Sequence, residues 1–267
     1  MKIEKVRIWQ NLQRIREEKP IIHNITNYVV MNSTANALLA LGASPVMAHA
    51  PEEVADIVDI ASALVINIGT LSRAWVRAMH RAMTEAGRKG IPIIIDPVGA
   101  GATAYRTKTV HDLVKTATPA IIRGNASEIM ALANSGVQTR GVDSLATSRH
   151  ALYTAQLLSR ELKTVICISG EADYCVHLER LVRISNGHPM MPMVTGLGCT
   201  ATALCGAFSA VEKDPLAAAV CAMAVMGLAG EMAGKDCPGP GTFQIRFLDA
   251  LYQMMEHDLA RIRLEVE

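Results

Sequence analysis

The stretch Val194-Thr195-Gly196-Leu197-Gly198-Cys199-Thr200-Ala201 leads into an uncharged run of small and apolar residues that ends at Val211. Two glycines followed by such a run predict a tight loop that turns directly into a buried helix. Because the first N–H groups of a helix bind anions, this turn favours a phosphate as its ligand. Cys199 lies at the turn, where the helix field would lower the pKa of its thiol. A glycine loop that only caps a core helix is the alternative.

The composition favours one large core. Half of the 267 residues are apolar and 19% are charged. The net charge of +1 gives no field that would attract nucleic acid or an anionic membrane. Six cysteines without a C-x-x-C pair predict reduced, mostly buried thiols rather than disulfides or a zinc site. The charged N-terminus is unlike a signal peptide, and the uncharged run 216–230 is short for a membrane span. We therefore expect a cytoplasmic protein.

Short apolar segments alternate with helix-like segments along the chain, which predicts an α/β fold with a mostly parallel sheet in a single domain over residues 1–267. The predicted strands are 21–30, 43–48, 63–70, 91–99, 120–124 and 165–170, with a hairpin at 174–178 and 181–185. The predicted helices are 3–18, 31–41, 51–59, 72–89, 110–116, 125–133, 144–162, 201–211, 215–230 and 247–263, with a looser segment at 136–143.

Turn-forming and polar residues follow several of these strands. The strand ends carry Gly69, Asp96-Pro97, Arg123-Gly124 and Ser169-Gly170. Ligands of open parallel sheets gather at the carboxyl ends of the strands. We therefore expect these groups to form a row along one edge, which the loop 195–199 joins.

Two carboxylates in this row are candidate metal ligands. Asp96 is exposed by the turn at Pro97, and Glu128 follows the strand that ends at Gly124. Carboxylates at such positions hold a hydrated Mg²⁺ beside a triphosphate. Each also has a purely structural interpretation: Asp96 as a turn former before proline, and Glu128 as the partner of Asn125 in a capping box.

Arg123 and Ser169 complete an inventory that suits phosphoryl transfer. Arg123 would face a phosphate and Ser169 would donate to one, although both residue types also occur at strand ends as solvated or turn-forming groups. Together with the carboxylates and the helix start, they supply the positioning and charge neutralisation that this reaction needs. The sequence contains no P-loop, dinucleotide-binding glycine motif or zinc-protease motif.

Eight ordered segments carry a resemblance to a known family. The chain resembles the hydroxyethylthiazole kinases, thiamine-salvage members of the ribokinase-like superfamily. The resemblance runs nearly end to end, through the segments 23–27 (HNITN), 45–47 (PVM), 67–70 (NIGT), 96–100 (DPVGA), 123–128 (RGNASE), 168–170 (ISG), 196–199 (GLGC) and 239–243 (GPGTF).

The resemblance implies a ribokinase-like three-layer α/β/α fold and an ATP-dependent kinase. The expected reaction is phosphorylation of the primary hydroxyl of 4-methyl-5-(2-hydroxyethyl)thiazole, with Mg²⁺ assistance. It implies that residues 196–200 form an anion hole and that Asp96 and Glu128 hold Mg²⁺ and phosphate. The nucleotide-binding candidates are Arg123, Ser169, Gly198 and Asn125.

The same resemblance implies that the partners are the thiazole alcohol, ATP and two further copies of the chain. Family members form trimers with the thiazole pocket between subunits. Met47 and Gly196 are expected to contact the thiazole. Residues 23–27 and Gly69 are expected to help line the shared pocket, with Asn24, Thr26 and Gly69 as substrate-binding candidates.

Cys199 is the candidate catalytic base, at a position where most ribokinase-like enzymes carry aspartate. A thiolate accepts protons, but burial against apolar walls would raise its pKa and oppose the helix field. Three other functions remain open. They are a kinase for another heterocyclic alcohol such as a hydroxymethylpyrimidine, an ATP-dependent NAD(P)HX dehydratase, and a non-catalytic small-molecule sensor.

Overall fold

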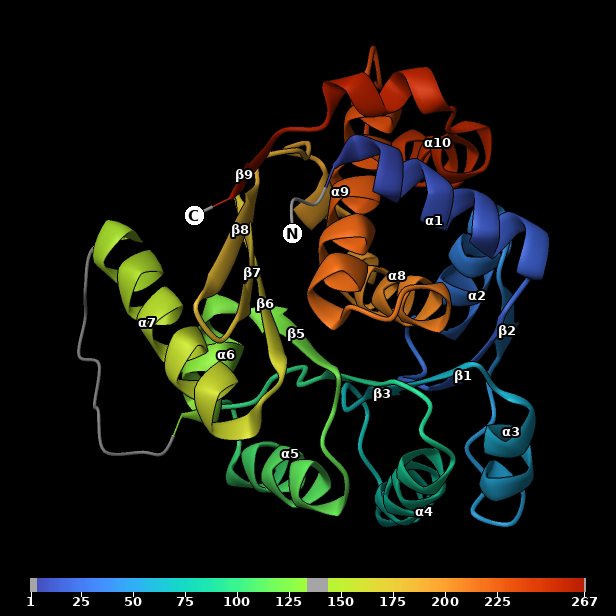
Figure 1. The fold of residues 1–267 in the computed structure, drawn as a ribbon, viewed down its shortest axis with the longest axis vertical. Helices are drawn as coiled ribbons and strands as arrows, with labels where there is room; N and C mark the ends of the chain where they lie inside the picture. Colours follow the sequence, from blue (N-terminus) through green and yellow to red (C-terminus); the bar gives the residue numbers. More distant parts are fainter. Residues whose placement is uncertain (1–3, 134–143, 267) are drawn as a thin grey trace.

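The computed structural model describes residues 4–133 and 144–266, and one nine-stranded sheet organises the chain (Figure 1). Strands β1 to β6 pair in parallel, whereas β7, β8 and β9 are joined by antiparallel pairing, which confirms the mostly parallel sheet. In spatial order they are β2 (Ser44–Val46), β1 (Ile21–Ile25), β3 (Ala63–Asn67), β4 (Ile93–Asp96), β5 (Ile121–Asn125), β6 (Val165–Ser169), β7 (Asp173–His177), β8 (Arg180–Ile184) and β9 (Leu264–Val266).

Helices cover both faces of the sheet, as Figure 1 shows, and this confirms the three layers. Residues alternate between two hydrophobic cores along each central strand: Val65 belongs to one core, while Leu64 and Ile66 belong to the other. One face carries α1 (Lys5–Glu18), α2 (Met31–Leu41), α8 (Leu197–Val211), α9 (Pro215–Gly234) and α10 (Pro240–Gln253). The other carries α3 (Val54–Ile60), α4 (Arg73–Lys89), α5 (Ala104–Thr116), α6 (Ala126–Leu132) and α7 (Ser144–Leu162).

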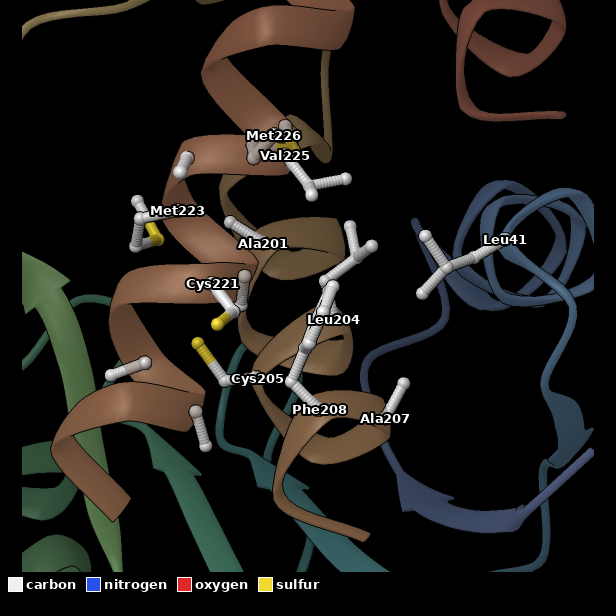
Figure 2. Packing of buried hydrophobic residues seen from close by; sticks show 14 of the residues in the cluster. Leu41, Ala201, Leu204, Cys205, Ala207, Phe208, Cys221, Met223, Val225 and Met226 are labelled. Atoms are coloured by element: carbon white, nitrogen blue, oxygen red, sulfur yellow. The ribbon is translucent and has the colours of Figure 1, made fainter. Parts of the chain in front are cut away.

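Helix α8, which contains the quoted stretch, lies directly on the sheet and is buried almost throughout. A Cβ at Gly206 would come within 2.6 Å of Val65 Cγ2, so glycine permits this close approach. Figure 2 shows Cys205 of α8 and Cys221 of α9 pointing toward one another. Helix α9 is long and apolar enough to cross a membrane, but 89% of its apolar window is buried inside the protein. It packs as a core helix.

The cysteines have the expected state. All six are free thiols, and Cys167, Cys175, Cys205 and Cys221 are buried. Within the part of the chain that the structure describes, no three His, Cys, Asp or Glu side chains gather into a metal cluster.

Several predicted helices have different bounds from those expected: α8 begins at Leu197 rather than 201, and α9 ends at Gly234 rather than 230. Helix α5 begins at Ala104 rather than 110, because Thr103 caps it and its first turns are polar. The prediction of one helix over 247–263 is wrong. Helix α10 begins at Pro240 and ends at Gln253, and the 3₁₀ helix η2 (Glu256–Arg261) and β9 follow. Proline at the first helical position starts α10, and pairing with β8 extends the last residues. The looser segment 136–143 lies outside the described residues.

Glu212 joins α1 to the turn between α8 and α9, and we expect its substitution to destabilise the fold. Arg7 donates two hydrogen bonds of 2.7 Å to its carboxylate and Asn11 donates one of 2.9 Å. Burial alone would raise the pKa of Glu212, but the bonds from Arg7, the Asp214 N–H and Asn11 lower it to about 2. Glu212→Gln should reduce the free energy of unfolding at pH 7 by about 1–3 kcal/mol. Urea titration checks this.

The pH dependence has a defined sign. Because the pKa of Glu212 is lowered in the folded state, its stabilisation is complete above its ordinary pKa of 4.5 and is lost as pH falls toward about 2. The difference between wild type and Glu212→Gln should therefore narrow below pH 4.5. Glu18→Gln, which breaks an exposed pair with Arg14, is the control and should change stability by less than about 0.5 kcal/mol. An equal effect of both substitutions would contradict the assignment.

Candidate active site

A cavity of about 720 Å³ opens at the carboxyl edge of the sheet, beside the start of α8. It brings together the four predicted nucleotide-binding residues, which come from three parts of the chain: Arg123, Asn125, Ser169 and Gly198. The rest of its lining includes Asp173, Leu197 and Met223, and the loop that follows β8. Of the row expected from the strand ends, Arg123 and Ser169-Gly170 line this cavity, whereas Gly69 and Asp96-Pro97 do not.

Arg123 supplies the cation of this cavity. Its side chain is 8% exposed, and Nη2 donates a 2.6 Å hydrogen bond to Ser169 Oγ. Its Nε is buried without a partner. A Cβ at Gly198 would lie 3.0 Å from Arg123 Nη1, so the guanidinium sits against the glycine backbone. Burial disfavours the charge, but Asp96 and other nearby groups outweigh burial and raise the pKa of Arg123.

Asp96 is the centre of a buried hydrogen-bond network at the end of β4. Its Oδ2 accepts from Thr202 Oγ1 of α8 at 2.8 Å and from Asn67 Nδ2 at 2.9 Å. Asn67 Oδ1 in turn accepts from Asn27 Nδ2 at 2.9 Å. Burial raises the pKa of Asp96 to about 6, although Arg123 and the bond from Thr202 act in the opposite direction. The network joins β3, β4, α8 and the loop after β1 around one carboxylate.

Glu128 makes the capping box that the sequence indicated. Asn125 Oδ1 accepts from the Glu128 N–H at 2.9 Å, and Glu128 Oε2 accepts from the Asn125 N–H at 2.8 Å. Glu128 Oε1 also accepts from the Gly99 N–H at 2.9 Å. The carboxylate therefore has a structural role and holds the loop after β4 in place. It is also close enough to Asp96 to raise the pKa of that group.

The start of α8 leaves its first N–H groups without a side-chain cap. Gly196 precedes the helix with φ of +90°, a backbone conformation that glycine adopts without strain. A Cβ there would also lie 2.7 Å from Val30 Cγ1. These free donors begin beside Gly198, which lines the cavity next to Arg123. The geometry suits an anion held between the helix start and the guanidinium.

The comparisons with known proteins agree on one family. The model of the hydroxyethylthiazole kinase family matches residues 12–257. The chain belongs to the hydroxyethylthiazole kinase family. A relative from Syntrophus aciditrophicus named hydroxyethylthiazole kinase is 58% identical over 262 residues, which cover 98% of this chain and 97% of the relative. The resemblance carried by the sequence motifs is thereby confirmed.

Solved structures confirm the fold. A structure of hydroxyethylthiazole kinase from Pyrococcus horikoshii OT3 superposes with a TM-score of 0.91 at 40% identity, over 98% of this chain and 99% of that one. A ribokinase-like superfamily protein from Enterococcus faecalis has a TM-score of 0.62 at 15% identity, over 86% of each chain. The latter shares the fold alone. The ribokinase-like three-layer architecture is therefore established for this member of the hydroxyethylthiazole kinase family.

Cys199 of this family member lies in the first turn of α8, where two influences on its pKa compete. Burial and the nearby Asp96 carboxylate raise the pKa of the thiol to about 11, against weaker opposite effects of hydrogen bonds from Asn67 and Asn27. Asn27 Nδ2 lies 3.5 Å from Cys199 Sγ. The expected lowering by the helix field does not prevail. Cys199 is therefore a neutral thiol at pH 7.

None of the predicted substrate-binding residues lines this cavity. Met47, Asn24, Thr26 and Gly69 belong to or follow β2, β1 and β3, whereas Gly196 precedes α8, next to the lining residues Leu197 and Gly198. Asn24 and Thr26 are buried in the single chain, while Met47 is half-buried on the edge of the sheet. His23 is also buried, and its Nε2 lies 2.9 Å from the Ala48 carbonyl oxygen, which holds the loop carrying Met47.

Sequence reasoning missed three groups that organise the site. Asn67 and Thr202 hold Asp96, and Arg106 donates to the carbonyl oxygens of Ile68, Val98 and Gly69 at 2.9, 2.6 and 2.8 Å. Arg106 thereby ties the loops after β3 and β4 together. Asn67 was visible only as part of the NIGT segment. Arg106 gave no signal, because the helix that carries it was expected to begin at residue 110 and begins at Ala104.

Proposed function

We propose that this chain transfers the terminal phosphoryl group of ATP to the primary hydroxyl of 4-methyl-5-(2-hydroxyethyl)thiazole, a step of thiamine salvage. The observation that carries the proposal is the cavity at the uncapped start of α8, where Arg123, Ser169 and Gly198 meet. Donors aimed at developing charge are what phosphoryl transfer requires. The names of the relatives supply the acceptor alcohol.

In this proposal one group of residues binds the phosphates of ATP and another binds the alcohol. The free N–H groups at the start of α8, within the predicted anion hole at residues 196–200, and the Arg123 guanidinium hold the migrating phosphoryl group and neutralise its charge. Ser169 orients Arg123 through the 2.6 Å bond, and Asn125, which pairs with Ser169 in the sheet, also lines the cavity. Met47, Asn24, Thr26, Gly69 and Gly196 bind the alcohol, in a pocket completed by a second copy of the chain in a homotrimer.

Asp96 and Glu128 fit a magnesium site. Mg²⁺ is usually held by about one or two carboxylates, with waters and substrate phosphates as its other ligands. Asp96 has only Oδ2 engaged by Thr202 and Asn67, which leaves Oδ1 as the oxygen to offer. Glu128 uses one N–H bond at each oxygen, and each oxygen retains a lone pair. When bound there, Mg²⁺ would be held by Asp96 and Glu128 and would supply positive charge that neutralises the phosphates.

An ADP-release assay tests the function. The purified protein is given ATP and Mg²⁺ with the thiazole alcohol, a hydroxymethylpyrimidine or hydrated NADH in parallel. We expect ADP release with the thiazole alcohol at a rate at least tenfold above either alternative. Preference for the pyrimidine would make it a different alcohol kinase, and release only with hydrated NADH would make it a dehydratase. ATP-independent binding of the alcohol without ADP release would indicate a sensor. Mass measurement in solution tests the trimer.

Cys199 assists the reaction in this proposal but is not indispensable. A loose phosphoryl-transfer transition state leaves the hydroxyl proton in place until late, so a base contributes toward the lower end of about 10²–10⁴-fold. Because burial and Asp96 raise its pKa to about 11, Cys199 is mostly the protonated thiol at pH 7, and little thiolate is present to accept a proton. Cys199→Ala should therefore keep measurable turnover, about 1% or more of wild type. Cys199→Asp should retain or exceed wild-type turnover, because a carboxylate is the better base.

Steady-state turnover of both variants checks this prediction, with unfolding temperature as the control for folding. Cys221→Ala, a buried thiol on α9 remote from the cavity lining, is the matched control and should leave turnover unchanged. A folded but inactive Cys199→Asp variant, together with undetectable Cys199→Ala activity, would overturn the weak-base assignment.

A further inference from the structure

The loop that joins β8 to η1 (Met191–Met193) forms one wall of the nucleotide cavity, and we call residues 185–192 the wall loop. Ser185, Asn186, His188 and Met191 of this loop face the cavity that Arg123 and Ser169 line from the other side. None of the sequence motifs that support the proposed function includes this segment. Contacts with α9 and with the C-terminal residues hold it in place.

Three glycines of α9 hold the wall loop against the helix backbone. A Cβ at Gly227 would come 2.6 Å from the Asn186 carbonyl oxygen, and one at Gly230 would come 2.5 Å from Met191 Sδ. A Cβ at Gly234 would overlap the ring of His188. Residues spaced by three and four share a helix face, so these glycines form one groove. The groove receives the loop at three points.

Asn186 attaches the wall loop to the C-terminal segment of the chain. The side chain is 4% exposed. Its Nδ2 donates to Glu231 Oε1 at 3.0 Å and to the Arg261 carbonyl oxygen at 3.1 Å, while Oδ1 accepts from the Arg263 N–H at 2.7 Å. Arg263 makes an ion pair with Glu231, and β9 follows directly and pairs with β8 (Figure 1).

The side chain of Asn186 has no N–H group left with which to contact a ligand directly. Both hydrogens of Nδ2 are used within the protein, and Oδ1 accepts a backbone N–H. Loss of these bonds would remove the Asn186 partner of the Arg261 carbonyl and of the Arg263 N–H in a partly buried place, which disfavours the observed packing. The loop would then move out of the groove, and the cavity would lose its wall.

We propose that Asn186 is a positioning residue for the nucleotide, through which Glu231 and residues 261–263 set the affinity for ATP. The inference rests on the proposed function, because it assumes that the cavity binds ATP. Apart from Gly196 at the start of α8, the candidate alcohol-binding residues lie on or after β2, β1 and β3, at the opposite end of the strand order from β8 and β9. The effect should therefore fall on the nucleotide and spare the alcohol.

The test measures binding of a non-hydrolysable ATP analogue with Mg²⁺ by calorimetry, together with the KM values for ATP and the alcohol. Asn186→Asp keeps the acceptor for Arg263 but turns the donor into a second carboxylate beside Glu231. We expect the analogue Kd and the KM for ATP to rise about tenfold, or about 1.4 kcal/mol. The KM for the alcohol and kcat should stay within twofold. Glu231→Ala removes one partner of Asn186 and should raise the same two constants by a smaller factor.

Two controls make the outcome decisive. Glu231→Gln keeps an oxygen that accepts the Asn186 Nδ2 hydrogen bond, and its Kd for the nucleotide analogue should stay within twofold of wild type. Arg183→Ala breaks an exposed pair with Glu265 between β8 and β9 and should change none of the constants. If Asn186→Asp does not fold, Glu231→Ala gives the same comparison. Unchanged nucleotide affinity, or equal rises in both KM values, would overturn the proposal. A wild-type protein that binds no nucleotide would instead refute the proposed function itself.

Discussion

Asp96→Asn should lower kcat at saturating ATP and Mg²⁺ by about 10³-fold, equivalent to about 4 kcal/mol of transition-state stabilisation. The amide keeps the size of the side chain and an oxygen for Thr202, but it removes the charge that the proposed metal site needs. Because burial raises the pKa of Asp96 to about 6, the ionised carboxylate is unfavourable to folding. The neutral amide should therefore unfold at the same temperature as wild type or higher, without added metal.

A coupled assay measures kcat, and thermal unfolding without added metal measures the unfolding temperature. Asp112→Asn, which changes an exposed carboxylate paired with Lys108, is the control and should leave turnover unchanged. Thr202→Val removes one hydrogen bond to Asp96 without changing charge, and it should cost less than tenfold. Asp96→Asn activity within tenfold of wild type would show that this carboxylate is structural only.

Arg123→Met should lower kcat/KM for ATP by about 10²–10³-fold, because it removes the cation that faces the start of α8. Methionine fills much of the same volume, and the loss includes the 2.6 Å bond to Ser169. Arg123→Lys keeps the charge but lacks the fork that reaches both Ser169 and the cavity, so we expect it to recover only part of the activity.

Initial rates at varied ATP concentration check this result, with the unfolding temperature measured on the same samples. Arg160→Met replaces an exposed arginine paired with Glu179, in the turn between β7 and β8, and should behave as wild type. Full activity of Arg123→Met would place the phosphate elsewhere and remove the basis for the proposed function.

Most of the sheet was predictable from the sequence because its central strands are short apolar runs that end in turn residues. Ile94 and Ile95 face opposite cores, so both had to be apolar. Asp96 ends the strand as predicted, but it is buried rather than exposed by the turn at Pro97, because its carboxylate is held by Thr202 and Asn67. The end of the chain was less predictable. Residues 254–263 are individually compatible with a helix, and only pairing of β9 with β8 extends the residues that follow.

The candidate site was predictable to the extent that its residues lie at strand ends. Arg123, Asn125, Ser169 and Gly198 could be grouped in advance, because parallel strands bring their carboxyl ends to one edge. Thr202 could not, since it sits in an apolar helix and its partner Asp96 is 106 positions away. The role of Asn186 could not be predicted either, because its hydrogen-bond partners come from α9 and residues 261–263.

The sequence by itself determined the alternation of strands and helices, the family, and the set of polar groups that end the central strands. These depend on local properties, namely apolar periodicity, glycine and proline positions, and short motifs. Only the tertiary structure decided that Cys199 is a neutral thiol, that Asn67 and Thr202 hold Asp96, and that the C-terminal segment supports the cavity wall. Burial and long-range hydrogen bonds decide these features, and both arise when distant segments pack together.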